Sequence, residues 1–375
     1  MTPGLVLQGD VENRPITIGR RKKLLFAAAM LLGIPLLAET VVRIRDAIRF
    51  GSTAPADQLY LPHPQLGKVL RPGATLSGAT TKVRINSLGF RGPEISVPKP
   101  PGTFRIACLG GSTTFGTYSS SDETTWPAFL QQKIQQRCPH LRVEVINAGV
   151  PGYRLAESRI NLLQRVVPID PDLVIVYHAC NDISSQQARA FGSQSQIASQ
   201  PMIGTQWLTR HSLLFDKLAK NIRIMQTPAT EPHRRDRLPD SAVRTYRQHL
   251  ESLLAECRDR NIPAALCTMA TQFRADQPEN IQRKAAGTAL YYNEYLSVEG
   301  LIHAYRTFNE ALQTVAEEHR LPSADLVAAV PGQSRYFGDS VHFTDAGCRR
   351  VADCIFAALV DAGLIPQDPQ RPETP

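Results

Sequence analysis

From residue 104 onward, short apolar runs of strand length alternate with longer segments that are apolar on one helical face. The runs predict buried strands at 104–109, 142–147, 172–177, 263–269 and 324–330. The periodic segments predict helices near 125–137, 154–166, 241–259 and 298–319, with a final one including 351–359. This alternation predicts a parallel sheet of about five strands with right-handed crossovers and helices on both faces, a flavodoxin-like three-layer α/β/α fold.

The most apolar segment lies near the N-terminus and has arginine and lysine residues on both sides. Residues 24–38 contain no charge, and with 39–42 the segment approaches the roughly 20 residues that a bilayer core needs. We therefore expect an uncleaved membrane anchor at 21–42, with its N-terminus inside and the domain that follows it in the periplasm or outside the cell. A cleaved signal peptide and a buried soluble helix are the alternatives.

The rest of the chain is divided by its composition. We expect a disordered leader at 1–20, because it lacks periodicity, and a β-rich juxtamembrane connector at 43–103, where Pro and Gly are frequent. We expect residues 104–364 to form the main domain. The polar insertion at 183–239, which includes Trp207, is expected to form a lid or substrate-shaping segment, with a peripheral helical excursion as the alternative. The polar, Pro-rich tail at 365–375 is expected to be disordered.

Overall composition narrows the class of protein. The 375 residues are 42% hydrophobic and carry a formal net charge of +8, which suffices for a large core. The basic clusters are short and no nucleic-acid motif accompanies them, so no nucleic-acid partner is expected. Seven cysteines show neither a disulfide framework nor a Cys-x-x-Cys pair, and His178 with Cys180 is an isolated pair. We expect no metal and no cofactor; the oligomeric state is open.

Candidate chemistry begins where the first strand of the domain ends. Residues 104–117 read FRIACLGGSTTFGT, so Ser112 follows the strand directly on two glycines. The carboxyl ends of strands in open α/β sheets are where ligands bind, and a serine there can meet a substrate. A structural alternative is that Ser112 and the threonines after it cap the next helix.

An acid and a base occur far downstream, at Asp339 and His342, just before a helix capped by Thr344 or Asp345. A serine hydroxyl needs an imidazole to take its proton, and the imidazole needs a carboxylate to fix its tautomer. Since Asp339 precedes His342 by three residues, it is able to reach the ring. We therefore predict Ser112, His342 and Asp339 as a catalytic triad.

Two further blocks follow strand ends: NAGVPG at 147–152 and Asn181 with Asp182. Together, the four blocks resemble those of the SGNH (GDSL-type) hydrolases, over roughly residues 84–360, and the segment NSLGFRG at 86–92 resembles one that precedes the nucleophile block in membrane-tethered members. The resemblance implies that the N–H groups of Ser112 and Gly152 and the amide of Asn181 form an oxyanion hole.

The sequence departs from the family pattern at two positions. Gly111 stands where the family has the Asp of Gly-Asp-Ser, and Ala179 replaces the Gly of Gly-x-Asn-Asp. Neither change removes a catalytic group. Two other motifs do not match. A phosphate loop needs a lysine where this chain has Thr117, and Ser112 is not part of the Gly-x-Ser-x-Gly elbow of α/β-hydrolases.

The resemblance thus implies a serine ester hydrolase, such as an esterase, lipase, acylhydrolase or carbohydrate deacetylase, working through an acyl-enzyme. Its partners are an ester or acylated carbohydrate and the membrane. Two alternatives stay open: acyl transfer onto a cell-envelope polysaccharide with the same residues, and a non-catalytic binding module that has kept the fold.

Overall fold

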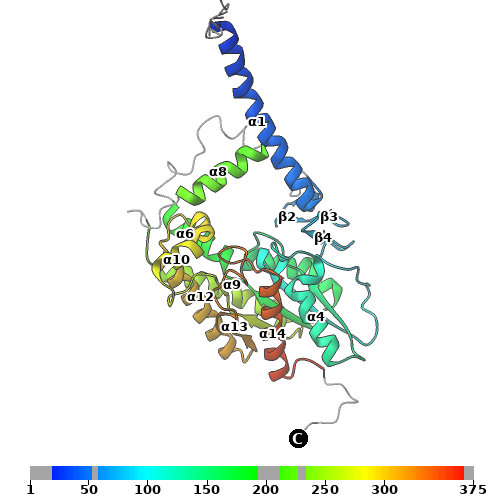
Figure 1. Ribbon diagram of the computed structural model, residues 1–375. Helices are drawn as coiled ribbons and strands as arrows, with labels where there is room; N and C mark the ends of the chain where they lie inside the picture. Colours follow the sequence, from blue (N-terminus) through cyan, green and yellow to red (C-terminus); the bar gives the residue numbers. More distant parts are fainter. Residues whose placement is uncertain (1–18, 53–57, 193–211, 227–233, 367–375) are drawn as a thin grey trace, which may run out of the picture.

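The computed structural model describes residues 19–52, 58–192, 212–226 and 234–366 (Figure 1). Its centre is a five-stranded sheet in the order β6-β5-β7-β8-β9, in which all neighbouring strands are parallel. The strands are β5 (Thr103–Gly110), β6 (Arg142–Asn147), β7 (Leu173–Tyr177), β8 (Ala264–Cys267) and β9 (Ser323–Ala324). This order, 2-1-3-4-5 along the chain, confirms the flavodoxin-like prediction and places the topological switch point between β5 and β7.

Helices cover both faces of the sheet, as right-handed crossovers require. The chain moves from β5 to β6 in one direction and then steps back across the sheet from β6 to β9. One layer therefore contains α4 (Trp126–Arg137) and α14 (Asp345–Asp361), which pack on each other, and the other layer contains α5 (Leu155–Asn161), α9 (Asp240–Arg258) and α12 (Val298–Glu318). All five residues of the central strand β7 are buried, which explains why it is a continuous apolar run.

Short elements connect these layers. The helices among them are α3 (Ser112–Phe115), α6 (Cys180–Phe191), α10 (Glu279–Ala285), α11 (Gly287–Tyr292) and α13 (Leu326–Ala329). A π-helical turn at Leu162–Val166 continues α5, and 3₁₀ turns lie at Asp122–Thr124 and Val167–Ile169.

The predicted strand at 324–330 is wrong in its extent. Only Ser323 and Ala324 pair with β8, and the chain then turns into α13. The cause is Asp325, whose carboxylate accepts a hydrogen bond from the N–H of Ala328 at 3.2 Å and caps the helix. The apolar residues after Asp325 therefore belong to α13, and the edge strand β9 contains only two residues.

The connector consists of two antiparallel hairpins with a small core of their own. They are formed by β1 (Tyr60–His63) with β2 (Gly67–Leu70), and by β3 (Thr75–Ser77) with β4 (Lys82–Arg84). Phe115, Val150 and Tyr153 of the catalytic domain belong to the same hydrophobic cluster as the hairpin side chains. The connector is therefore packed against the loops that follow β5 and β6.

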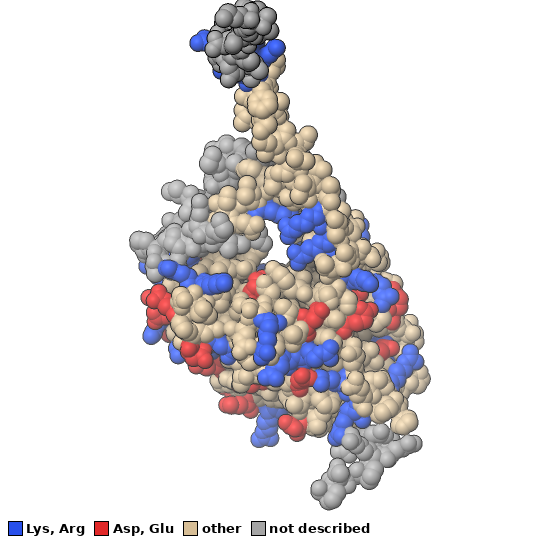
Figure 2. Space-filling model, viewed as in Figure 1, with Lys and Arg blue, Asp and Glu red and all other residues tan. Residues whose placement is uncertain are grey.

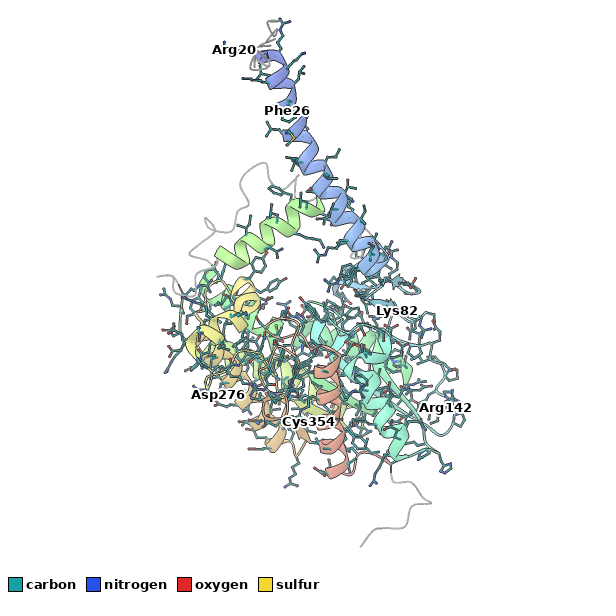
Figure 3. The ribbon with its side chains drawn as sticks, viewed as in Figure 1. Arg20, Phe26, Lys82, Arg142, Asp276 and Cys354 are labelled. Atoms are coloured by element: carbon teal, nitrogen blue, oxygen red, sulfur yellow. The ribbon has the colours of Figure 1, made fainter. Side chains whose placement is uncertain are left out.

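The N-terminal helix α1 runs from Arg20 to Phe50, beyond the predicted end at residue 42. At 1.5 Å per residue it is about 46 Å long, and it projects from the body of the protein (Figure 1). Its apolar side chains are exposed, Leu24 by 70% and Phe26 by 69%; Phe26 is labelled on the projecting part in Figure 3. By length and composition the helix is able to cross a membrane, as is a signal sequence. The alternative of a buried soluble helix is excluded.

Part of the insertion at 183–239 is the helix α8 (Leu213–Gln226), which lies beside α1 (Figure 1). Glu39 of α1 accepts hydrogen bonds from the N–H groups of Leu213 and Leu214, at 3.1 and 2.8 Å, and from the hydroxyl of Ser212. Residues 193–211, including Trp207, and most of the predicted leader and tail lie outside the described residues.

Candidate active site

Ser112 is the first residue of α3, directly after the carboxyl end of β5. Two glycines allow the backbone to pack tightly around it. A Cβ at Gly110 would lie 1.9 Å from the hydroxyl oxygen of Thr114, and one at Gly149 would lie 2.4 Å from the backbone nitrogen of Phe115. The two glycines therefore let the loop after β6 approach the serine-bearing turn.

A continuous chain of hydrogen bonds joins Ser112 to the predicted base and acid. The Oγ of Ser112 lies 2.7 Å from Nε2 of His342, and Nδ1 of that ring lies 2.9 and 2.8 Å from the two carboxylate oxygens of Asp339. With its proton on Nδ1, facing the carboxylate, the imidazole presents Nε2 as an acceptor to the serine hydroxyl. Residues 227 positions apart along the chain thus meet at one edge of the sheet.

The carboxylate of Asp339 is held by its own loop. Its Oδ1 accepts hydrogen bonds from the N–H groups of Val341 at 3.0 Å and His342 at 2.9 Å. Burial favours the neutral acid, but the hydrogen bond and charge of His342 and these N–H groups outweigh it and lower the pKa of Asp339 below its ordinary value. Asp339 is therefore ionised and oriented before any ligand arrives.

Backbone donors are left without acceptors beside Ser112. Within the part of the chain that the structure describes, neither the N–H of Ser112 nor that of Gly152 donates a hydrogen bond to a protein group. Gly152 has a φ of +92°, a conformation that favours glycine. Its neighbour Val150 donates to the carbonyl of Gly110 at 3.1 Å, which ties the two loops together.

Asn181 lies at the same edge, at the start of α6 after β7. Its Nδ2 donates to the carbonyl of Tyr153 at 2.9 Å, which leaves its second N–H to point elsewhere. A Cβ at Gly111 would lie 2.8 Å from the same Nδ2, closer than real Cβ contacts come. A side chain at position 111 would therefore require the amide of Asn181 to shift.

Arg91, in the segment that precedes the nucleophile block, was not predicted to take part in the site. Its side chain is only 1% exposed; it donates to Asp122 at 2.8 Å and to the carbonyls of Phe115 and Gly116 at 2.9 and 2.7 Å. These carbonyls end α3, so Arg91 holds the far end of the turn that presents Ser112. The sequence gives no clear signal for this role, because Asp122, the partner of Arg91, lies 31 residues away along the chain.

A cavity of about 1010 Å³ opens in front of Asp339 and His342. The ring of Tyr118 lies against it, with its centroid 5.8 Å from that of His342. The cavity is also lined by residues 45, 49 and 50 at the end of α1, in the predicted connector, and by Lys217 and Asn221 of α8, in the predicted insertion. Both elements therefore contribute to the wall that faces a substrate.

Three other titratable side chains near the sheet are buried and have shifted pKa values: His178, Asp182 and Cys348. Burial lowers the pKa of His178 to about 3 and raises that of Asp182 to about 7, so the pair is not an ionic one near neutral pH although its atoms approach to 3.8 Å. The imidazole of His178 instead shares a hydrogen bond of 2.7 Å with Ser158. Burial raises the pKa of the Cys348 thiol to about 11, which keeps it protonated.

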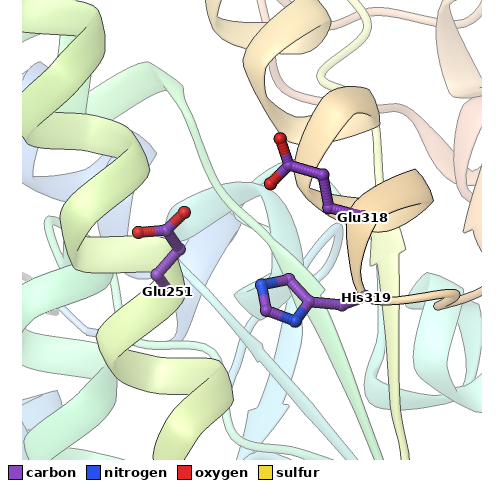
Figure 4. A group of neighbouring side chains, drawn as sticks. All are labelled: Glu251, Glu318 and His319. Atoms are coloured by element: carbon purple, nitrogen blue, oxygen red, sulfur yellow. The ribbon is translucent and has the colours of Figure 1, made fainter.

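One cluster outside the site has the composition of a metal-binding group. Figure 4 shows Glu251, Glu318 and His319, whose possible ligand atoms lie within 4.8 Å of one another. The guanidinium of Arg247 donates to both carboxylates, to Glu251 at 2.8 Å. An ion pair between α9 and α12 thus accounts for the approach of the two acids.

Comparison with known proteins identifies the family of the chain. The model of the GDSL-like lipase/acylhydrolase family matches residues 108–350, which is more than half of the chain. No curated protein matches the sequence. Among solved structures, an acetylxylan esterase from Geobacillus stearothermophilus is 14% identical, with a TM-score of 0.43, over 68% of this chain and 94% of that one. A GDSL-like lipase from Bacteroides thetaiotaomicron is 14% identical, with a TM-score of 0.39, over 69% and 88%. The family match shows that the chain is an ester-bond hydrolase of the GDSL-like lipase/acylhydrolase family.

Proposed function

We propose that the protein cleaves esters through a covalent acyl-enzyme on Ser112. Nε2 of His342 takes the hydroxyl proton as Oγ of Ser112 attacks the ester carbonyl, and the resulting imidazolium gives the proton to the leaving alcohol. Water, deprotonated by the same imidazole, then attacks the acyl-enzyme, releases the carboxylic acid and restores the serine. Asp339 stabilises the imidazolium that forms in each step.

The oxyanion of each tetrahedral intermediate would be held by three donors: the N–H groups of Ser112 and Gly152 and the free N–H of Asn181. The support for this assignment is that the two backbone donors lack acceptors within the described part of the chain. One such donor typically contributes about 3 kcal/mol of transition-state stabilisation.

The observation that carries the proposal is the chain of hydrogen bonds from Ser112 through His342 to Asp339. The test is the release of p-nitrophenol from p-nitrophenyl acetate and longer esters by the full-length protein in a neutral detergent. We expect turnover by the wild type and at least about a 10³-fold loss in Ser112→Ala. Full activity in Ser112→Ala would refute the mechanism. Labelling of Ser112 by a phosphonate without turnover of any ester would favour the acyltransferase alternative.

We further propose that α1 is an uncleaved anchor and that the catalytic domain lies in the periplasm or outside the cell. The support is that Glu39, near the end of the apolar run, caps α8, and that α8 shapes the cavity. Washing membranes with alkaline carbonate should leave the full-length protein in the pellet. Recovery in the supernatant, or a mature N-terminus after Ala38, would contradict the anchor.

A further inference from the structure

The cavity in front of His342 is strongly basic. Its lining includes four cations and one carboxylate, Asp339, among the residues that the structure describes. The cations are Arg45 and Arg49 from α1, Lys217 from α8 and Lys284 from α10. Figure 2 shows the hollow below α1 with basic side chains gathered at its edge.

Most of this charge is not neutralised by the protein. Lys217 pairs with the buried carboxylate of Asp46 at 2.6 Å, and Asp339 is engaged by His342. Across the described ranges, no carboxylate lies within 4.0 Å of the side-chain nitrogens of Arg45, Arg49 or Lys284. Within these ranges, three unpaired cations therefore line the same cavity as His342 and Asp339.

The fold fixes the two arginines relative to the site. The end of α1 is bonded to the connector, where the N–H of Ala79 donates to the carbonyl of Ile48 at 2.6 Å. A Cβ at Gly78 would lie only 2.0 Å from the carbonyl oxygen of Arg49, so glycine is needed for this contact. Since the connector shares its core with the loops after β5 and β6, the helix end is held at a set distance from them. The arginines thus belong to the wall of the cavity.

The remaining lining combines apolar side chains, Phe50, Ile281 and Ala285, with polar and aromatic ones that suit a hydroxyl-rich ligand. It includes the amide side chains of Asn221, Gln272 and Gln333 and two aromatic rings, Tyr118 and Tyr292, which are 40% and 52% exposed. Amides bond to hydroxyl groups, and exposed aromatic faces pack against the C–H faces of sugar rings. A fatty acyl chain would instead need a continuous apolar wall.

We propose that the substrate is an O-acylated acidic saccharide, whose carboxylates bind Arg45, Arg49 and Lys284 while the ester lies at Ser112. Guanidinium groups match carboxylates with two parallel hydrogen bonds, and a basic cleft also draws polyanions toward the site. This inference rests on the proposed function for its reaction, but its charge selectivity is testable by binding alone.

The first experiment measures binding to the full-length Ser112→Ala variant in a neutral detergent, with trigalacturonate and the neutral xylotriose as probes. We expect trigalacturonate to bind at least tenfold more tightly than xylotriose, and to weaken as salt is raised. Adding Arg45→Gln and Arg49→Gln should abolish that difference, whereas the control Arg283→Gln, on α10 beside Lys284, should not change it. Equal binding of both probes would overturn the inference.

The second experiment compares acetate release from O-acetylated trigalacturonate and O-acetylated xylotriose. The wild type should show a kcat/KM at least tenfold higher for the acidic ester. The paired arginine variant should lose this preference through a higher KM for the acidic ester, whereas the control Arg283→Gln should keep it. Faster release of fatty acid from phosphatidylglycerol vesicles than of acetate from the acidic ester would overturn the inference in favour of a lipid. Inactivity on every ester, with selective binding intact, would contradict only the proposed hydrolysis.

Discussion

At the scale of single residues, the chemistry that we propose depends on three side chains within hydrogen-bond reach of one another. A serine after a strand and an Asp-x-x-His before a helix predict a triad, because the reaction requires those groups in hydrogen-bond reach. The structure brings Ser112, His342 and Asp339 together. Arg91 could not be predicted, because its role depends on carbonyls that end α3, and a sequence does not show which carbonyls lack partners.

Asn181 is expected to act on the transition state. Its free N–H meets an oxyanion only once charge develops, so Asn181→Ala should lower kcat by about 10²-fold with little change in KM. Asn181→Asp keeps the shape but replaces the donor with a negative charge, and it should be at least as slow. The measurement is kcat and KM of both variants on p-nitrophenyl acetate. A change confined to KM would assign Asn181 to substrate recognition.

Gly111 is expected to act through Asn181. The new Cβ of Gly111→Ala would lie 2.8 Å from Nδ2 of Asn181, so the amide must move. We expect roughly a tenfold loss in kcat, and overpacking that costs about 1–3 kcal/mol of stability. In the double variant with Asn181→Ala, the loss should not exceed that of Asn181→Ala alone. Gly287→Ala, where a Cβ would meet nothing within 4 Å, is the matched control. If the loss in kcat of the double variant equals the product of the two single losses, Gly111 acts independently of Asn181.

At the scale of elements, periodicity identified most of the central strands and helices because each is long or continuously buried. It failed at 324–330, where Asp325 turns an apolar run into α13. An aspartate at the start of such a run indicates a helix N-terminus. Because the edge strand ends at Ala324, Asp325 is able to cap the helix. The sequence patterns also did not predict which side chains of different elements contact one another. Asp182 of α6, for instance, accepts a hydrogen bond from the N–H of Leu155, the first residue of α5, at 3.1 Å.

The burial of Asp182 predicts how stability changes with pH. Burial raises the pKa of Asp182 from 3.8 to about 7, so the folded protein binds a proton there that the unfolded chain releases above about pH 4. The stabilisation is full below pH 4 and is lost as the pH rises to about 7. Asp182→Asn keeps the acceptor without the charge, so its melting temperature should rise relative to the wild type between pH 4 and pH 7. A difference that is constant with pH would show that Asp182 is ionised in the fold.

At the scale of the whole molecule, three segments that were expected to be separate line one cavity: the start of the connector at residues 45–50, the insertion and the domain itself. The sequence predicts an anchor, a connector, a domain and an insertion from composition, but their packing depends on contacts such as that of Glu39 with Leu214. Because α1, α8 and the connector all contribute to the surroundings of Ser112, the membrane-proximal part of the chain is part of the catalytic apparatus that we propose.

The central claim is that Ser112 and His342 work as one unit, and kcat/KM of Ser112→Ala, His342→Ala and the double variant tests it most directly. A base without its nucleophile has no proton to take, so either single substitution should cost nearly what both cost together, while Asp339→Asn should cost less because the imidazole remains. Losses that multiply in the double variant, or a single variant that keeps wild-type activity, would contradict the account.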